Sequence, residues 1–226
     1  MTQIQTHSQP LTDTRVMPVV HTMFRRELRL AGGLLRGVPD GATARAAVVA
    51  DHLDLVSEVL HHHHTAEDEL LWPLLLERVP DDLAPIVHLM ESQHGRVEQL
   101  LDELRPLQAQ WRRTAGATER DRMGELHDEL YVALAEHLDA EEQRLLPIAA
   151  RTVTQAEWEG MGEAARAGTP KGKQFVVFGM IAYDGGPDGV ALMMQGAPAP
   201  VRWLVPRLGA RAYRRHALAV HGTASP

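Results

Sequence analysis

A sixteen-residue pattern occurs twice in this chain, shifted by 74 positions. The first copy reads LHHHHTAEDELLWPLL (60–75) and the second reads LAEHLDAEEQRLLPIA (134–149). Six positions are identical, namely Leu60/Leu134, His63/His137, Ala66/Ala140, Glu67/Glu141, Leu71/Leu145 and Pro73/Pro147. Both copies contain H-x-x-x-E, and residues four apart share one face of a helix. The chain therefore carries the same candidate metal-ligand pair in two related helices.

Each copy is preceded by one further histidine at nearly the same distance. His21 lies 42 residues before His63, and His94 lies 43 residues before His137. Both upstream histidines fall among apolar residues at helical spacing. Each half of the repeat is therefore a helix with one inward histidine, a turn, and a helix with H-x-x-x-E. Two such hairpins that pack face to face would bring four histidines and two glutamates to one centre.

Four amphipathic segments with 3.6-residue apolar spacing predict four long helices. They span residues 13–36, 42–79, 83–113 and 118–152 and are separated by short breaks that contain Gly, Pro or Asp. Long helices joined by short turns are antiparallel neighbours, so the predicted fold is all-α, an up-down-up-down four-helix bundle. Pro73 and Pro147 each fall inside a segment and are expected to kink or divide it.

The last third of the chain is less regular. A short helix is expected over 155–166, a linker over 167–172 and a turn over 184–188. Residues 174–183 (QFVVFGMIAY) fit either a buried helix or a strand, and residues 198–221 form a basic amphipathic stretch.

These features predict three parts. Residues 1–11 form a disordered lead, residues 12–152 form the bundle, and residues 153–226 form a mostly helical C-terminal extension. The extension is expected to pack on the bundle or to form a homodimer contact.

Composition excludes several classes of protein. The chain has no cysteine, which removes disulfides, zinc-thiolate sites and iron–sulfur clusters. The first residues lack the features of a signal peptide, and no apolar run is long enough for a membrane span, so a cytoplasmic location is expected. The net charge is −11 over residues 1–150 and +4 over residues 151–226. An acidic main body argues against nucleic acid as the principal partner.

The repeated histidines and glutamates point to a metal centre. A single inward histidine is usually an ordinary core residue, but burying two carboxylates and four imidazoles without a cation would be costly. Imidazoles and carboxylates without thiolates suit two iron ions better than structural zinc, with manganese a weaker fit than iron. If each ion forms about six bonds, the four imidazoles, two bridging carboxylates and an oxo or hydroxo bridge fill about ten of about twelve positions.

The order of these ligands resembles the hemerythrin-like, or HHE cation-binding, family over about residues 15–150. The matching motif is His21, His63-x-x-x-Glu67, His94 and His137-x-x-x-Glu141. The ends of both copies also resemble the family's E-E-x-x-L-x-P, with Asp68 in place of the second glutamate in the first copy. The resemblance implies a four-helix bundle with a non-haem di-iron centre that binds dioxygen or reacts with peroxide or nitric oxide. It also implies that Glu67 and Glu141 are bridging carboxylates.

One position departs from the oxygen-carrying members of the family. Where they have a fifth histidine, one turn before the third-helix ligand, this chain has Met90. His64 is the first candidate replacement, ahead of Tyr131 and Glu91. Without a replacement the site would have an extra open position, and turnover of peroxide, a catalase- or peroxidase-like activity, would be expected rather than reversible dioxygen binding.

Two alternatives remain open. A ferritin-like centre would use Glu58-x-x-His61 and Glu91-x-x-His94, although these fall on the second and third segments instead of the second and fourth. A non-enzymatic sensor or iron-binding module would report oxygen or iron status through the C-terminal extension.

The other histidines are expected to have ordinary structural roles. His61 and His62 are predicted near the surface, as is His64 if it is not a ligand. His52 lies eleven residues before His63, close to three full turns, so it is predicted in the core. His88 and His127 are predicted at the surface.

Overall fold

The computed structural model describes residues 10–81 and 83–226, and every regular element within them is helical. The predicted all-α class is therefore confirmed. In chain order the elements are α1 (Val16–Arg36), α2 (Thr43–Ala66), the π-helical turn η1 (Glu67–Leu71), α3 (Trp72–Arg78), α4 (Ala84–Thr114), α5 (Ala117–Ala140), the π-helical turn η2 (Glu141–Leu145), α6 (Leu146–Thr152), α7 (Gln155–Ala167), α8 (Gln174–Met193) and α9 (Ala199–His221). None of these helices is both long and apolar enough to cross a membrane.

The beginning of the first helix differs slightly from the prediction. Helix α1 starts at Val16 instead of Asp13, because the Asp13 carboxylate accepts a hydrogen bond from the Arg15 backbone N–H at 3.1 Å. Such a local side-chain bond competes with helical hydrogen bonding. The predicted disordered lead lies outside the described residues except for positions 10 and 11, where the Leu11 N–H donates to the Ala150 carbonyl at 2.7 Å.

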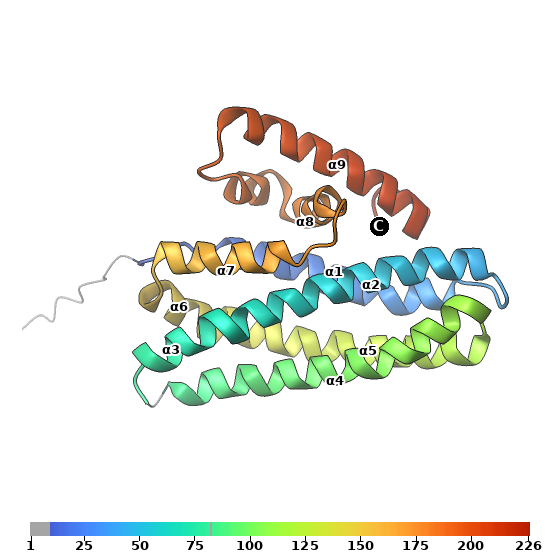
Figure 1. Cartoon of the computed structure of the whole chain (residues 1–226), viewed down its shortest axis with the longest axis horizontal. Helices are drawn as coiled ribbons and strands as arrows, with labels where there is room; N and C mark the ends of the chain where they lie inside the picture. Colours follow the sequence, from blue (N-terminus) through green and yellow to red (C-terminus); the bar gives the residue numbers. More distant parts are fainter. Residues whose placement is uncertain (1–9, 82) are drawn as a thin grey trace, which may run out of the picture.

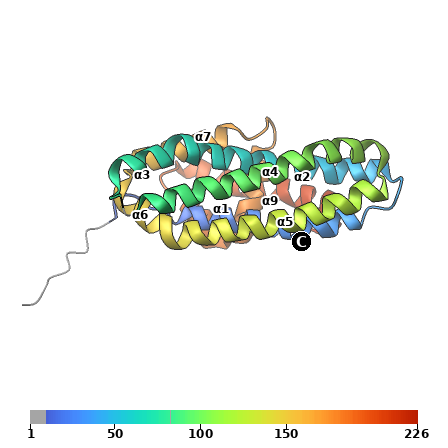
Figure 2. The same cartoon turned by 90° about the horizontal axis from the view of Figure 1, so that it is seen from below.

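Four long helical rods lie side by side in the first two thirds of the chain (Figure 1). Helix α1 is one rod and α4 is another, while α2–η1–α3 and α5–η2–α6 are each continuous rods. Helix α1 contacts α2 and α5, and α4 contacts the same two neighbours, so the rods enclose one interior (Figure 2). Side chains from all four rods can therefore meet at one level of that interior.

Two apolar clusters fill the interior on either side of a polar layer. The larger cluster includes Phe24, Leu53, Leu60, Val97 and Leu134, and the smaller one includes Met17, Leu71, Trp72, Met90 and Leu145. Burial of each such side chain contributes about 1.5–3 kcal/mol. The histidines and glutamates of the repeat lie between the two clusters, so tight apolar packing on both sides holds their helices in place.

Pro73 and Pro147, which were predicted to kink or divide their segments, lie where the α-helix is interrupted by a π-helical turn and the rod continues beyond it. Each follows a π-helical turn, in which the Trp72 N–H donates to the Glu67 carbonyl and the Leu146 N–H donates to the Glu141 carbonyl, five residues back. A proline interrupts the hydrogen-bond ladder and its ring crowds the preceding turn. The wider π turn relieves this conflict, and the proline then sits in the first turn of α3 or α6. Both glutamates of the repeat are the first residues of these turns.

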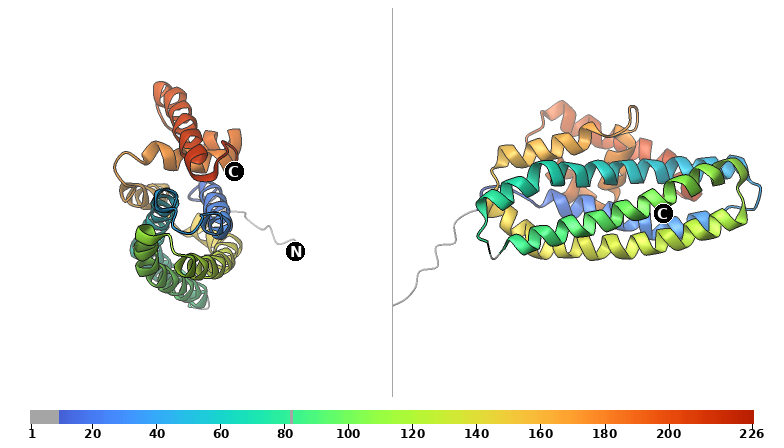
Figure 3. Two further views of the ribbon diagram at one scale, coloured as in Figure 1. Left: turned by 90° about the vertical axis from the view of Figure 1, so that its right-hand side faces the viewer. Right: turned by 60° about the horizontal axis from the view of Figure 1, so that its bottom comes forward.

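The C-terminal extension lies against one side of the rods (Figure 3). Helix α7 contacts α2, and α8 contacts α1 and α9. The Thr154 side chain and Glu157 form a capping box at the start of α7. The segment 174–183, for which a helix and a strand were both predicted, is helical.

The predicted turn at 184–188 is a kink inside α8. Gly186 has φ 57° and ψ −162°, a conformation that is essentially restricted to glycine, and Pro187 follows it. Pro187 can begin a new helical turn because its fixed φ suits the helix and its missing N–H is not needed there. Helical structure therefore resumes at once and continues to Met193.

His127 is buried, so its predicted surface position was wrong. Its side chain is 1% exposed, and neither ring nitrogen has a hydrogen-bond partner. The residue shares the inward phase of α5 with Met123, Leu130 and Leu134, and the apolar packing of that face decides its position. Burial lowers the pKa of His127 to about 4.

Substitution of His127 by leucine is expected to stabilise the protein. At pH 7 the free energy of unfolding should rise by about 1–3 kcal/mol, because an unsatisfied buried polar group is removed. Below the ordinary histidine pKa of about 6.5 the unfolded chain binds a proton that buried His127 does not, so wild-type stability falls as pH falls towards about 4. The advantage of His127→Leu should therefore grow by about 2 kcal/mol between pH 7 and pH 5.

Urea denaturation of both proteins at pH 7 and pH 5 measures this difference. His127→Gln also cannot titrate in this range. Its free energy of unfolding should depend on pH in the same way as that of His127→Leu, with a smaller increase over wild type at pH 7. Equal pH dependence of wild type and His127→Leu would contradict the assignment of His127 as a buried neutral residue.

Candidate metal centre

All six predicted ligands meet in the polar layer, and His64 joins them. Donor atoms of His64, Glu67, His94 and His137 form one group, and donor atoms of His21, His63, Glu67 and Glu141 form a second group. Within each group every donor atom lies within 4.8 Å of the others. Glu67 belongs to both groups, which is the arrangement expected of a carboxylate between two adjacent ions.

The distances between donor atoms match ligands of a common ion. The Nε2 atoms of His94 and His137 are 3.1 Å apart. His63 Nε2 lies 3.3 Å from Glu67 Oε1, and His21 Nε2 lies 3.3 Å from Glu141 Oε2. Two neighbouring donors at about 2.0–2.1 Å from one ion are separated by about 2.8–3.0 Å in octahedral geometry and by about 3.3–3.4 Å in tetrahedral geometry. The side chains are therefore already spaced as ligands.

The donor atoms are buried and lack other partners. Glu67, Glu141, His21 and His137 are completely buried, and His63 is 6% exposed. Both carboxylate oxygens of each glutamate have no hydrogen-bond partner, and the same holds for the Nε2 atoms of His21, His63 and His64. Buried polar atoms are nearly always satisfied in folded proteins. A cation between the two groups would satisfy all of them together, so these residues fit a metal pair.

Burial disfavours the charged forms of Glu67, His63 and His64 and so shifts the pKa of each. Burial raises the pKa of Glu67 well above its usual range, and the nearby Glu141 and Asp68 carboxylates raise it further. Burial lowers the pKa values of His63 and His64 well below their usual range, and neighbouring imidazoles add to this shift. Neutral imidazoles can donate their lone pairs to a metal ion. A nearby positive charge would in turn favour ionisation of the buried carboxylates.

Two acidic residues outside the donor set orient the upstream histidines. His94 Nδ1 lies 2.7 Å from Asp68 Oδ1, and His21 Nδ1 lies 2.9 Å from Glu142 Oε1. When Nδ1–H donates to the carboxylate, the lone pair of Nε2 faces the centre. Asp68 and Glu142 each directly follow a glutamate of the repeat, so the two halves use the same device. Neither residue was predicted in this role, although the acidic pairs Glu67–Asp68 and Glu141–Glu142 recur in both copies of the repeat.

Further side chains hold these acidic residues. The Trp72 indole N–H donates to Asp68 Oδ1 at 2.6 Å, and Arg25 Nη1 donates to Glu142 Oε1 at 2.7 Å. Arg25 also forms an ion pair with Asp139 at 2.7 Å. Both upstream imidazoles are thus fixed by chains of hydrogen bonds that extend to the edge of the bundle.

His63 and His64 are adjacent in the chain, and both side chains lie in the interior of the bundle. The His64 ring stacks on the His94 ring with centroids 3.9 Å apart, whereas the His63 ring lies 5.4 Å from His21 and 5.3 Å from Phe24. Consecutive residues point about 100° apart around a helix, and α2 lies between α1 and α4. His63 therefore faces α1 while His64 faces α4. Met90 is packed in the smaller apolar cluster, so His64 supplies a fifth imidazole that Met90 does not.

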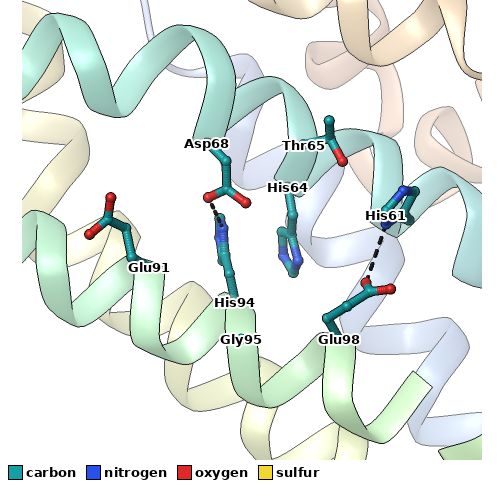
Figure 4. Close-up of a pocket in the computed structure, with 8 residues that line it drawn as sticks. All are labelled: His61, His64, Thr65, Asp68, Glu91, His94, Gly95 and Glu98. Carbon is teal, nitrogen blue, oxygen red and sulfur yellow. Dashed lines mark hydrogen bonds and ion pairs between the residues drawn. The ribbon is translucent and has the colours of Figure 1, made fainter. Parts of the chain in front are cut away.

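A surface pocket of about 480 Å³ opens beside the centre, between α2 and α4 (Figure 4). His64 and His94 lie on its inner side. The remaining lining residues are His61, Thr65, Asp68, Glu91, Gly95 and Glu98. The pocket gives small molecules a route towards the buried imidazoles.

Of the four residues of the alternative ferritin-like motif, only His94 lies at the centre. His61 is half exposed and pairs with Glu98 at 3.2 Å, and Glu91 is exposed and pairs with His88. Glu58 is exposed as well. The ferritin-like interpretation is therefore wrong for this chain.

A helical bundle with imidazoles and carboxylates gathered between its rods defines a cation-binding helical protein. The hemerythrin HHE cation-binding domain matches residues 12–149, more than half of the chain. The chain therefore belongs to the hemerythrin HHE family. No curated protein and no solved structure matches it significantly.

Proposed function

We propose that the chain binds two iron ions at this centre and uses them to bind dioxygen. The observation that carries the proposal is the position of Glu67, whose carboxylate is shared by two donor groups. Manganese suits the same donors less well. The ligands would be His64, His94 and His137 for one ion and His21, His63 and Glu141 for the other, with Glu67 between them. An iron pair would supply the redox chemistry and an open coordination position.

The number of imidazoles supports binding over turnover. His64 brings the donor set to five imidazoles and two carboxylates, so fewer positions stay open than in the six-residue site expected from sequence. The group with two imidazoles, His21 and His63, then has the open position. Phe24 packs against His63, and apolar clusters lie on both sides of the layer, so the surroundings of this group are largely apolar.

The protein contributes orientation and charge. Asp68 and Glu142 hold the Nδ1 protons of His94 and His21, which keeps the Nε2 lone pairs inward. Arg25 balances the charge of Glu142 at 2.7 Å. These contacts keep the donors in position before any ligand arrives, which reduces the cost of binding.

Stopped-flow mixing of the reduced, iron-loaded protein with dioxygen tests the proposal. We expect a spectral change that reverses when dioxygen is removed. In a separate experiment in which hydrogen peroxide is added to the iron-loaded protein, we expect the peroxide to be consumed slowly. Rapid peroxide disproportionation would support the alternative, a catalase- or peroxidase-like enzyme. Iron binding with no response to dioxygen, peroxide or nitric oxide would overturn both.

Gly95 offers a matched control for the route of entry. A Cβ atom placed on Gly95 meets no other atom within 4 Å. Gly95→Leu should therefore fold, narrow the pocket and slow the reaction, whereas Gly95→Ala should leave the rate nearly unchanged. Iron content should be the same in all three proteins. Equal rates would show that ligands enter elsewhere.

A sensor or iron-binding module remains a second candidate, and one observation favours it. Helices α1 and α2 carry donors of the centre and also contact the extension, since His52 of α2 lies 3.0 Å from His216 of α9. A shift of α2 on oxidation would reach α9 directly. Greater proteolysis of the extension on oxidation, without turnover, would support this candidate.

We also propose the hemerythrin-like up-down-up-down order for residues 12–152, with residues 153–226 as a separate extension. The short connections between consecutive rods, residues 37–42, 79–83 and 115–116, support the alternating order. The predicted homodimer contact and the cytoplasmic location stay predictions.

A further inference from the structure

A second cluster of metal-binding side chains lies where the extension meets the bundle. Glu27 of α1, His52 of α2 and His221 of α9 place donor atoms within 4.8 Å of one another. His52 Nε2 is 3.1 Å and His221 Nε2 is 3.7 Å from Glu27 Oε2. His52 and His63 are eleven residues apart on α2, or about 16 Å along the helix. The cluster is therefore separate from the candidate iron centre.

We propose that Glu27, His52 and His221 form a mononuclear zinc-type site that fastens helix α9 to the bundle. Two imidazoles and one carboxylate are ligands for a divalent first-row ion, and zinc accepts three protein ligands with water in the fourth position. Calcium and magnesium require mainly oxygen ligands, so they do not suit the cluster.

The donor atoms are buried and unsatisfied. Glu27 and His52 are at most 1% exposed, and the His221 side chain is 5% exposed. Glu27 Oε2 and the Nε2 atoms of both histidines have no hydrogen-bond partner. Without a cation these atoms have only one another as partners, the closest contact being the 3.1 Å between His52 Nε2 and Glu27 Oε2, and incomplete compensation of a buried carboxylate costs free energy. Their convergence on one point indicates a bound cation.

The surrounding contacts leave these atoms free for a metal. Glu27 Oε1 accepts a hydrogen bond from Arg26 Nη2 at 2.5 Å, which leaves Oε2 for the ion. Arg26 also lies 3.3 Å from Asp184, so its positive charge is shared with a second carboxylate. His52 Nδ1 lies 3.0 Å from His216 Nε2, and a hydrogen bond between them would orient His52 as outer partners of zinc ligands do.

Helix α9 is held at the end that supplies His221. Arg45 of α2 donates to the Ala219 carbonyl at 2.7 Å and to the Val220 carbonyl. These bonds satisfy carbonyl groups in the last turn of the helix, which lack helical partners. The last turn of α9 is thus aligned with α2 independently of any metal, and His221 is positioned for coordination.

Cobalt(II) titration of the metal-free full-length chain tests the proposal, because four-coordinate cobalt has much stronger visible absorption than six-coordinate cobalt. We expect one strongly absorbing cobalt per chain in wild type. The same band should appear in the triple variant Glu67→Ala, His63→Ala and His94→Ala, which removes donors from both groups of the candidate iron centre. The cobalt band at Glu27, His52 and His221 is therefore expected whether or not the other centre binds iron.

Variants of the cluster decide the outcome. His221→Ala and Glu27→Gln should both lose the band, whereas His88→Ala, which removes an exposed histidine, should keep it. His216→Ala should weaken cobalt binding by about 10–100-fold. Zinc should raise the Tm of wild type and of His88→Ala but not of His221→Ala. Circular dichroism confirms that each variant is folded. A band that survives in both folded cluster variants, or its absence in wild type, would overturn the proposal.

Discussion

Glu67→Ala is expected to lose more iron than Glu141→Ala, which is expected to keep about one ion. Glu67 belongs to both donor groups, but Glu141 belongs only to the group with His21 and His63. Without Glu141 the three imidazoles of the other group and Glu67 remain, and four protein ligands suffice for one ion. Iron content per chain, measured by elemental analysis after loading, should fall by about half in Glu141→Ala and should fall further in Glu67→Ala, which weakens both donor groups.

Glu69→Ala provides the matched control for this pair. Glu69 lies in the same π turn as Glu67 but is exposed, so its removal should leave the iron content at the wild-type level. Equal iron contents in Glu67→Ala and Glu141→Ala would contradict the shared position of Glu67. Unchanged iron in both would exclude these glutamates as ligands.

Gly179→Ala is expected to destabilise the docking of the C-terminal extension. A Cβ atom on Gly179 would lie 2.2 Å from the Gly209 carbonyl oxygen and 2.6 Å from Tyr213 Cβ. Because one of these neighbours is backbone, α8 and α9 must move apart. Overpacking of this kind costs about 1–3 kcal/mol or more. Faster proteolysis of α9 and a lower urea midpoint would measure it.

Gly160→Ala is the matched control on a neighbouring helix. A Cβ atom on Gly160 of α7 meets no other atom within 4 Å, so the same substitution should stabilise that helix by about 1 kcal/mol through its higher helix propensity. Iron content should stay unchanged in both variants, since the donors lie on other helices. Equal stability of the two variants would contradict the close approach of α8 and α9.

The repeat in the sequence predicts which side chains converge at the centre. Helical spacing places His63 and Glu67 on one face, and the same holds for His137 and Glu141, because side-chain direction in a helix follows directly from residue number. The apolar phase of each segment also indicates which way His21 and His94 point. Local periodicity was therefore sufficient to predict that six side chains from four rods point into the same interior.

Other features depend on which helices are neighbours. His64 lies beside His63 and would point away from a centre on one side of α2, but α1 and α4 flank that helix on both sides, so both histidines reach the interior. His127 is buried because the inward face of α5 is covered along its whole length. The π turns depend on a balance between the steric demands of the prolines and the burial of Glu67 and Glu141. Helical periodicity in the sequence does not reveal this balance.

Residue spacing along the chain thus defined four amphipathic helices and a repeated ligand set, since helical periodicity is a local property of the backbone. The cluster of Glu27, His52 and His221 has no such origin, because its members are 25 and 169 residues apart. They meet where the end of α9 lies against α1 and α2. Docking of distant helices is governed by long-range packing and charge, and only the folded chain contains that information.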